Sequence, residues 1–581
     1  MLNQIASYAI RQFPGIEPGF GPVRTKWRIS IAPDFHVTIE PFGGEHGDEL
    51  TNCPEFPENL LQGGGKSNFL VDTLQVMLLL LDDKKDDPEK YNAKHNYFVD
   101  LIEKAKKESQ ITELSTAASF LSNPDSLLAA QARLAELGAK PTDKAFFMLG
   151  EFDPLQDERC RAWWRKFRRQ LLNDSVKKPK SMVCLLSGET NIPAQTHPKI
   201  SGLKRVGGRG QDIVVGCDKD AFKSYMLEQA ENGAMSETMA NAYAKGLDDL
   251  ISKHSKTLAG AKVVHWFKEQ VNPEEDPLEW LNGFESEGQT EAAAQVAARR
   301  LLESLRTGER IDLGNNHYYA LTLSGASGRV MVRDWMEGRF EDLVRNIEAW
   351  FSDLAIVSRD GKGQAHDPKF LAVCGALVRD LKDLPAPSAA TLWKVAVQRL
   401  PIPQSFMTQA LARFRTDLVD KDQPPFNHAR MSLIKAYFVR LKSGGKHTMS
   451  AYLNPDHPES AYHCGRLLAF FSNLQRAALG DVGAGVVQRY YVAASQTPGL
   501  ILGRLTSNAR NHLGKLEGGL AHWYENQIAD VMTRLGDGAP RILDLNGQGL
   551  FALGYYQQLA ALRSGNKNRT TEAITEQGET K

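Results

Sequence analysis

The spacing of apolar residues changes near residue 338, and this change constrains the fold more than any other feature. From about 338 to 565 apolar residues recur almost throughout at the three- and four-residue spacing of amphipathic helices. Earlier, period-two runs such as 24–42 and 317–335 are typical of strand pairs. Helices are expected between them, at 94–140, 159–172 and 219–258. We therefore predict an α+β protein, with a mixed α/β N-terminal region followed by an all-helical C-terminal bundle.

The length of 581 residues predicts more than one domain. We expect an α/β region over 1–350 that binds DNA, a helical connecting region over 351–448 and a helical bundle over 449–565. The last segment, 566–581, is poor in large apolar residues and is predicted to be disordered.

Composition excludes several classes of protein. Lysine and arginine total 70 and so do the acidic residues, so any nucleic-acid contact must come from local patches. The six cysteines occur singly, which argues against a disulfide framework or a zinc ribbon and favours a reducing cytosol. The N-terminus lacks a signal-peptide pattern, and the apolar run at 76–81 is too short to cross a bilayer. We expect a soluble, cytoplasmic protein.

No catalytic or metal-binding pattern stands out. The sequence has no P-loop, HExxH or GxSxG motif. His317 and Tyr318 could form a general acid–base pair, although hairpin packing is the commoner role for such residues. Cys184, His197 and Cys217 could contribute to a zinc site, but single ligands are more typical of a buried thiol and a turn-capping imidazole. We expect no enzymatic activity, no metal and no cofactor.

A cationic stripe is expected on the helix at 159–172. Its arginines recur at i, i+4, i+7 and i+8, whereas the apolar residues fall on another face. Few acidic residues interleave, so the stripe is either a phosphate-binding surface or a solvated face. The residues concerned are Arg161, Arg165, Arg168 and Arg169.

Two glycine-rich loops also carry polar side chains. The loop at 199–210 could bring its backbone and its cations close to phosphates, or could be a mobile surface loop. The loop at 62–68 could donate to base edges in a DNA groove, or could be only a turn. The candidate residues are Lys199, Lys204, Arg205 and Arg209 in the first loop, and Gln62, Lys66, Ser67 and Asn68 in the second.

Several blocks of the sequence together resemble the large subunit of the type I-C CRISPR Cascade complex. The family's Cys-x-x-Ser/Thr-Gly and His-Pro-x-Ile-x-Gly stretches match 184–202, and its Ala-Phe-x-Ser-Tyr to Ser-Glu stretch matches 221–237. Met226 departs from the glycine that usually follows Ser-Tyr. The other matching blocks are 68–73, 328–335, 461–475, 489–495 and 552–558.

The resemblance implies a non-enzymatic subunit of an RNA-guided surveillance complex. Such a subunit recognises a short protospacer-adjacent motif, helps open the target DNA, stabilises the displaced strand and helps recruit a helicase–nuclease. The implied partners are the guide-RNA complex with its backbone and guide-end-binding subunits, copies of a small subunit, double-stranded target DNA and the helicase–nuclease, with no membrane. The alternatives are a nuclease that uses His317 and Tyr318, and a scaffold that contacts only protein.

Within this interpretation the loop at 62–68 would read the motif and the cationic surfaces would hold phosphates. A polar stripe in the C-terminal part would hold the displaced strand, with two neighbouring helical tyrosines more typical of core packing than of base stacking. The stripe consists of Arg504, Asn508, His512 and Lys515, joined by Arg489 beside Tyr490 and Tyr491.

The resemblance also implies that the same gene yields the small subunit from an internal start. Met449 is the best candidate, with Met431 as the alternative. Gly444 and Gly445 lie just upstream and could be encoded by a ribosome-binding sequence. Pro458 is predicted to lie in the first turn of the following helix.

Overall fold

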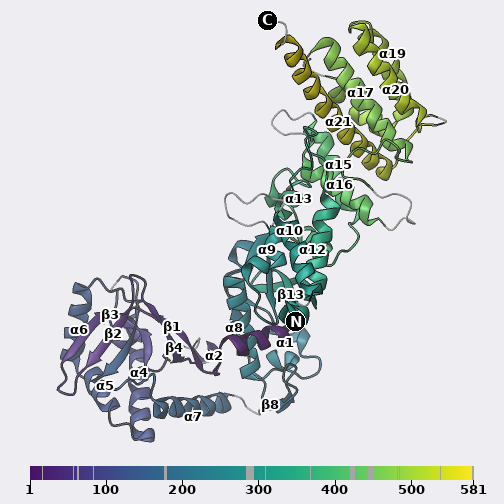
Figure 1. The fold of residues 1–581 in the computed structure, drawn as a ribbon. Helices are drawn as coiled ribbons and strands as arrows, with labels where there is room; N and C mark the ends of the chain where they lie inside the picture. Colours follow the sequence, from purple (N-terminus) through teal and green to yellow (C-terminus); the bar gives the residue numbers. More distant parts are fainter. Residues whose placement is uncertain are drawn as a thin grey trace. The chain divides into compact units, whose positions relative to one another are not determined.

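The chain folds into two compact units of α+β character, which confirms the predicted fold class. Unit 1 comprises Met1–Ile200 and Ile213–Asp248, and unit 2 comprises Ser201–Asp212 and Asp249–Lys581 (Figure 1). The computed structural model describes all residues except 16, 57, 62–63, 83, 176–179, 259, 283–292, 308, 367, 419–425, 442–448, 481, 483–484, 537 and 579–581, and leaves out the side chains of 58–59, 173, 175, 282, 293–295 and 565–578. No helix in the described part of the chain is long and apolar enough to cross a membrane.

Unit 1 is built on a four-stranded mixed sheet in the order β3-β2-β6-β5. Its strands are β2 (Trp27–Ile31), β3 (Val37–Pro41), β5 (Val71–Thr73) and β6 (Lys144–Leu149). β2 pairs in parallel with β6 and antiparallel with β3, which confirms the strand pair predicted within 24–42. Trp27, Ile29 and Ile31 are buried whereas Arg28 is exposed, as expected for a strand with one apolar face.

Helices pack on this sheet and close its core. Asp87 caps the first of them by accepting hydrogen bonds from the amides of Glu89 and Lys90. Trp164 packs nearly parallel to Phe69, with ring centroids 5.6 Å apart. The helices are α4 (Pro88–Ser109), α5 (Leu114–Leu121), α6 (Pro124–Glu136) and α7 (Glu158–Ser175). The remaining early elements are α1 (Leu2–Gln12), β1 (Phe20–Thr25) paired with β4 (Asp48–Pro54), α2 (Glu58–Leu61) and α3 (Leu74–Met77).

The segment before α8 is less helical than its sequence predicts. Only the short 3-10 turns η2 (Asp220–Phe222) and η3 (Gln229–Gly233) form before α8 (Glu237–Lys253) begins. Met226 has a φ of 57° and Gln229 a φ of 43°, and such left-handed residues cannot continue a right-handed helix. The predicted helix over 219–236 is therefore wrong, whereas the short strands predicted at 180–216 are present as β7 (Met182–Val183), β8 (Thr190–Asn191), β9 (Lys199–Ile200) and β10 (Asp212–Ile213).

Unit 2 contains an antiparallel run of four strands in the order β11-β12-β13-β14. The strands are β11 (Ser255–Leu258), β12 (Ala261–Phe267), β13 (His317–Ala326) and β14 (Arg329–Arg339). β13 and β14 form the hairpin predicted at 317–335, and they meet at a turn where Ser327 and Gly328 both have positive φ. The short turn η1 (Lys204–Val206) precedes these strands in the sequence. Between and after them lie η4 (Pro273–Glu275), α9 (Pro277–Asn282), α10 (Ala293–Arg306), α11 (Ile311–Gly314) and α12 (Phe340–Leu354).

The rest of unit 2 is helical, as the periodicity predicts. Its first helices are α13 (Phe370–Gly375), η5 (Leu381–Asp383), α14 (Ala386–Val397), α15 (Gln404–Asp417) and α16 (His428–Arg440). They are followed by α17 (Ser460–Leu479), α18 (Val486–Gln496), α19 (Pro498–Leu513), α20 (Gly518–Thr533) and α21 (Leu545–Gly578). One apolar core runs from Leu258 to Leu562 and so spans both predicted segments, 351–448 and 449–565.

Two details of these helices differ from expectation. Glu459 is the N-cap of α17, so Pro458 precedes the helix rather than lying in its first turn. Proline lacks an N–H, and its placement one residue earlier still keeps the helix from extending backwards. α21 continues to Gly578 and so enters the segment 566–581. Because no side chains beyond Ser564 are described, the disorder of that segment stays a prediction.

α17 and α21 cross in direct backbone contact, side by side in Figure 1. A Cβ placed on Gly465 would lie 2.0 Å from the carbonyl oxygen of Phe551, and one placed on Gly554 would lie 2.0 Å from that of Tyr462. Only glycine fits at these two positions. Since Tyr462 and Tyr556 are buried beside the crossing, the close approach also sets the packing of the bundle core.

The crossing predicts a large difference between two glycine substitutions. Gly554→Ala should destabilise the bundle by about 1–3 kcal/mol, because the new methyl group overlaps backbone. Gly503→Ala in α19 is the control, since its methyl group would meet no neighbouring atom within 4 Å and alanine favours helix. Hydrogen exchange of α17 and α21 amides in the full chain should accelerate in the first variant only. Equal exchange in both variants would contradict the predicted contact.

Candidate nucleic-acid interface

The arginine stripe on α7 is largely neutralised by glutamates. Arg165 donates to Glu17 at 2.9 Å and to Glu158 at 2.5 Å, and these hydrogen bonds raise its pKa above the usual value. Arg161 lies 3.8 Å from each of the same two carboxylates. Arg168 is buried and donates through both terminal nitrogens to Glu237.

These ion pairs change the interpretation of the stripe. Arg161, Arg165 and Arg168 each have a carboxylate partner, so they are poorly available to phosphates. Arg169 is exposed and has no acidic partner among the described residues. Glu17 and Glu237 lie 148 and 69 residues from the arginines they bind, so no pattern within the helix could have indicated them.

The glycine-rich loop before β10 encloses a carboxylate of its own chain. Asp212 is fully buried, and its oxygens accept the backbone N–H groups of Arg209 at 3.0 Å and Gly210 at 3.3 Å. Gly208 is required there, because a Cβ would lie 2.3 Å from Asp212 Oδ2. The backbone amides predicted to cradle phosphate therefore bind Asp212 instead.

The cationic side chains of this loop nevertheless reach solvent. Lys204, Arg205 and Arg209 are exposed in unit 2, whereas Lys199 belongs to unit 1 and is half-buried. Lys262 on β12 lies near Arg205, and burial together with the charge of Arg205 lowers its pKa. Lys262 was missed from sequence, because only the packing of the loop against the sheet brings it to this patch. We call Lys204, Arg205, Arg209 and Lys262 the unit 2 basic patch.

The C-terminal end of the predicted motif-reading loop is held by hydrogen bonds to neighbouring residues. Gln62 lies outside the described residues, and Ser67 is only 2% exposed. The side-chain oxygen of Asn68 accepts a hydrogen bond from the backbone N–H of Phe56 at 3.2 Å. The backbone N–H of Asn68 donates to the carboxylate of Asp72 at 2.9 Å. Asn68 therefore anchors the loop, whereas the Ser67 hydroxyl is buried with no hydrogen-bond partner among the described residues. Neither side chain offers a free polar group at the surface of the loop. Lys66 remains half-exposed, with its Nζ 5.7 Å from the centroid of the Phe56 ring.

The C-terminal polar stripe converges more closely than the sequence could show. Arg489, Asn508 and His512 line one small pocket of about 120 Å³ in the bundle, together with Gln475 and Tyr490. Burial lowers the pKa of His512, and the charge of Lys515 adds to this effect. The sequence placed Asn508 and His512 on one face of α19, but only the packing of α18 beside α19 adds Arg489.

The flanking residues of this stripe differ in exposure. Arg504 and Lys515 are exposed. Tyr491 is 2% exposed, and its ring lies 4.5 Å from Phe414 and 5.8 Å from Tyr555, centroid to centroid. The prediction that a helical tyrosine here packs in the core is thus confirmed for Tyr491, whereas Tyr490 lines the pocket.

The residues considered for catalysis are not brought together. His317 is exposed at the start of β13, whereas Tyr318 is buried, and burial raises its pKa to about 12. Consecutive strand residues face opposite sides of a sheet, so the two side chains cannot act as one acid–base pair.

Two of the three residues considered for zinc have separate partners, whereas no partner is described for Cys217. The Cys184 thiol accepts the amide of Ser236 at 3.3 Å, and His197 Nδ1 lies 2.7 Å from the hydroxyl of Tyr243. In the part of the chain that the structure describes, the side chains close enough to share a metal ion are instead His265, Asp276 and Glu279. His265 and Asp276 already form a buried ion pair at 2.7 Å.

Comparison with known families completes the description of these surfaces. The sequence model of the family described as CRISPR-associated protein (Cas_Csd1) matches residues 12–563, which is nearly the whole chain. The chain belongs to this family. This match confirms the resemblance to the large subunit of the type I-C Cascade, so the chain is a Cascade-type CRISPR-associated protein. No curated protein matches it.

Proposed function

We propose that this member of the Cas_Csd1 family binds target DNA within an RNA-guided complex and performs no catalysis itself. The observation that carries the proposal is the convergence of Arg489, Asn508 and His512 on one pocket, with Arg504 exposed on α19 and Lys515 exposed just after its end. Cationic and amide side chains beside a half-buried tyrosine suit the phosphates and bases of a single strand. The bundle surface would therefore hold the strand that the guide RNA displaces.

The other surfaces have complementary roles in this proposal. Guide RNA reads the target by base pairing, so the protein needs to read only the adjacent motif and to hold backbone. Opening a base step costs a few kcal/mol, and one discriminating base contact supplies about 1–3 kcal/mol. A single loop contact cannot open the duplex, so Lys66, the unit 2 basic patch and the bundle would share the work. The separate helicase–nuclease would then be recruited to the opened DNA.

The competing functions have less support. A nuclease built on His317 and Tyr318 would need both side chains on one side of the sheet, which β13 does not provide. A scaffold that contacts only protein would have no need of exposed cations such as Lys204 and Arg209, for which the described residues supply no acidic partner. DNA binding that is insensitive to salt would favour the scaffold.

The displaced-strand surface predicts a salt effect that depends on the helix face. Arg504→Ala should weaken target binding by the assembled complex. It should also reduce the magnitude of the slope of log K, where K is the observed DNA-binding constant, against the logarithm of the salt concentration. The expected reduction is roughly 0.7, the value for one single-strand phosphate contact. Arg510→Ala is the matched control, because it removes an exposed arginine from another face of α19. Equal slopes for the two variants would contradict a strand-binding face.

The motif-reading loop predicts a loss of discrimination. Lys66→Ala in the assembled complex should reduce the preference for DNA with the correct motif, because Lys66 is the described residue of the loop that still presents a donor. Lys104→Ala, which removes an exposed lysine from α4, should leave the preference unchanged. Binding should be measured on two duplexes that differ only in the motif. An unchanged preference in Lys66→Ala would exclude this residue as the reader.

We also propose that translation starts internally at Met449. A product of residues 449–581 would keep all of α17, α18, α19, α20 and α21. Met431 is buried within α16, so a start there would add only part of a helix that packs against other elements. Met449 itself is 8% exposed, with its sulfur 3.3 Å from His457 Nε2, so it also has a structural role as a core residue.

This start predicts a second product from the intact gene. Expression should yield the full chain and a short chain that begins at residue 449, identified by mass spectrometry. Synonymous recoding of Gly444 and Gly445, and separately Met449→Leu, should each reduce the short chain while the full chain persists. Absence of the short chain from the wild-type gene, or indifference to both changes, would show that Met449 is only a core residue.

A further inference from the structure

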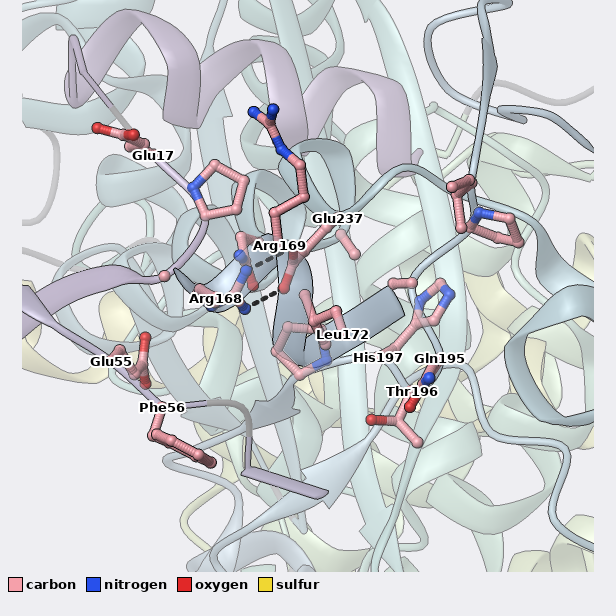
Figure 2. Close-up of a pocket in the computed structure, with 18 of the residues that line it drawn as sticks. Glu17, Glu55, Phe56, Arg168, Arg169, Leu172, Gln195, Thr196, His197 and Glu237 are labelled. Carbon is pink, nitrogen blue, oxygen red and sulfur yellow. Dashed lines mark hydrogen bonds and ion pairs between the residues drawn. The ribbon is translucent and has the colours of Figure 1, made fainter. Parts of the chain in front are cut away.

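A pocket in unit 1 is not explained by the roles proposed above. It has a volume of about 460 Å³, within the range of small-ligand sites. Figure 2 shows Glu55 and Phe56 on one side, Gln195, Thr196 and His197 on the other, and α7 side chains between them. The start of α8 contributes Glu237, Ala240 and Asn241.

The charges of the lining restrict the ligand. Three arginines and three glutamates line the pocket, but Arg168 is bound to Glu237 and Arg165 to Glu17. Arg169 remains as the lining cation without an acidic partner among the described residues. Glu55 is the third carboxylate of the lining, and one available guanidinium beside it limits the ligand to at most a single negative charge. A polyphosphate or a cluster of free phosphates would require several unpaired cations.

The uncharged lining suits a heterocyclic base. Gln195, Thr196 and Asn241 can donate and accept hydrogen bonds, as base edges require. His197 is 6% exposed, and its Nδ1 lies 2.7 Å from the hydroxyl of Tyr243. Burial lowers the pKa of His197, with an opposing effect of a backbone hydrogen bond at Gly233, so the ring adds no charge to the lining. Leu172 and Ile192 supply apolar contact surface.

We propose that this pocket holds one unpaired nucleotide of a bound strand, with its phosphodiester on Arg169 and its base among Gln195, Thr196 and Asn241. A nucleotide within a strand carries one negative charge on its phosphate and an uncharged base with donors and acceptors, which matches the lining. The energetic cost of unstacking is small for a base that is already unpaired. This inference rests on the proposed role of the chain in binding nucleic acid.

The test uses the full chain and short strands that carry 2-aminopurine, whose fluorescence changes when the base leaves the stack. The fluorophore is placed at successive positions of a single-stranded DNA and of the matching RNA. We expect one position in one of the two strands to change its emission on binding, and this result identifies the source of the nucleotide. If no position changes in either strand while the chain binds both, the pocket does not hold a base.

Substitutions then connect the signal to the pocket. Arg169→Ala and Asn241→Ala should each weaken the fluorescent binding mode about tenfold, and Arg169→Lys should retain most of it because it keeps the charge. Lys166→Ala is the matched control, since it removes an exposed cation from α7 outside the pocket lining. Circular dichroism and thermal unfolding establish that each variant is folded. Equal effects of Arg169→Ala and Lys166→Ala on the emission would overturn the proposal.

Failure of this inference can be distinguished from failure of the proposed function. If the assembled complex binds target DNA in a salt-dependent manner while the 2-aminopurine signal is absent or insensitive to the pocket variants, only the nucleotide pocket is wrong. If the complex shows no salt-dependent DNA binding, the proposed function itself is wrong.

Discussion

The ion pair between Arg168 and Glu237 organises the functional part of unit 1. It joins α7 to the start of α8, two elements far apart in sequence, through a two-pronged interaction of a buried guanidinium. Removing Glu237 would leave the buried guanidinium of Arg168 unpaired, which is costly. Gly19 lies against the Arg168 side chain, since a Cβ on Gly19 would be 2.4 Å from Arg168 Cδ. The pair thus fixes the α7 face, shapes the pocket beside it and leaves Arg169 as the cation available for ligands.

Close backbone contacts play the corresponding role in unit 2. The crossing of α17 and α21 depends on Gly465 and Gly554, and the loop around Asp212 approaches β13 so closely that a Cβ on Gly325 would lie 2.2 Å from Gly208. These contacts fix the backbone that carries the polar side chains, because neither the helices nor the loop can shift without a steric clash. Arg489 consequently meets Asn508 and His512 at one pocket, and the unit 2 basic patch stands on a sheet.

With the backbone fixed by these ion pairs and close contacts, the chain has several separate cationic surfaces despite its zero net charge. A Cascade-type protein with such surfaces can hold nucleic acid at defined places without attracting it indiscriminately, since long-range attraction follows net charge. Many of its arginines are paired internally, so in the proposed function the binding would depend on the cations that have no acidic partner among the described residues. Activity would then depend on individual residues rather than on overall basicity.

The sequence by itself determined the α+β class, the hairpin at 317–335, the helical C-terminal part and the family, because these depend on local periodicity and on blocks of contiguous residues. It also placed Asn508 and His512 on one helix face, which requires only the helical repeat. Tertiary structure alone decided which polar groups are available. Glu17 and Glu237 neutralise the α7 stripe, Asp212 occupies the amides of the glycine loop, and Asp72 with Phe56 engages Asn68. Local spacing could not reveal these partners, because ion pairs and hydrogen bonds depend on distance in space, and folding brings together residues far apart in the chain.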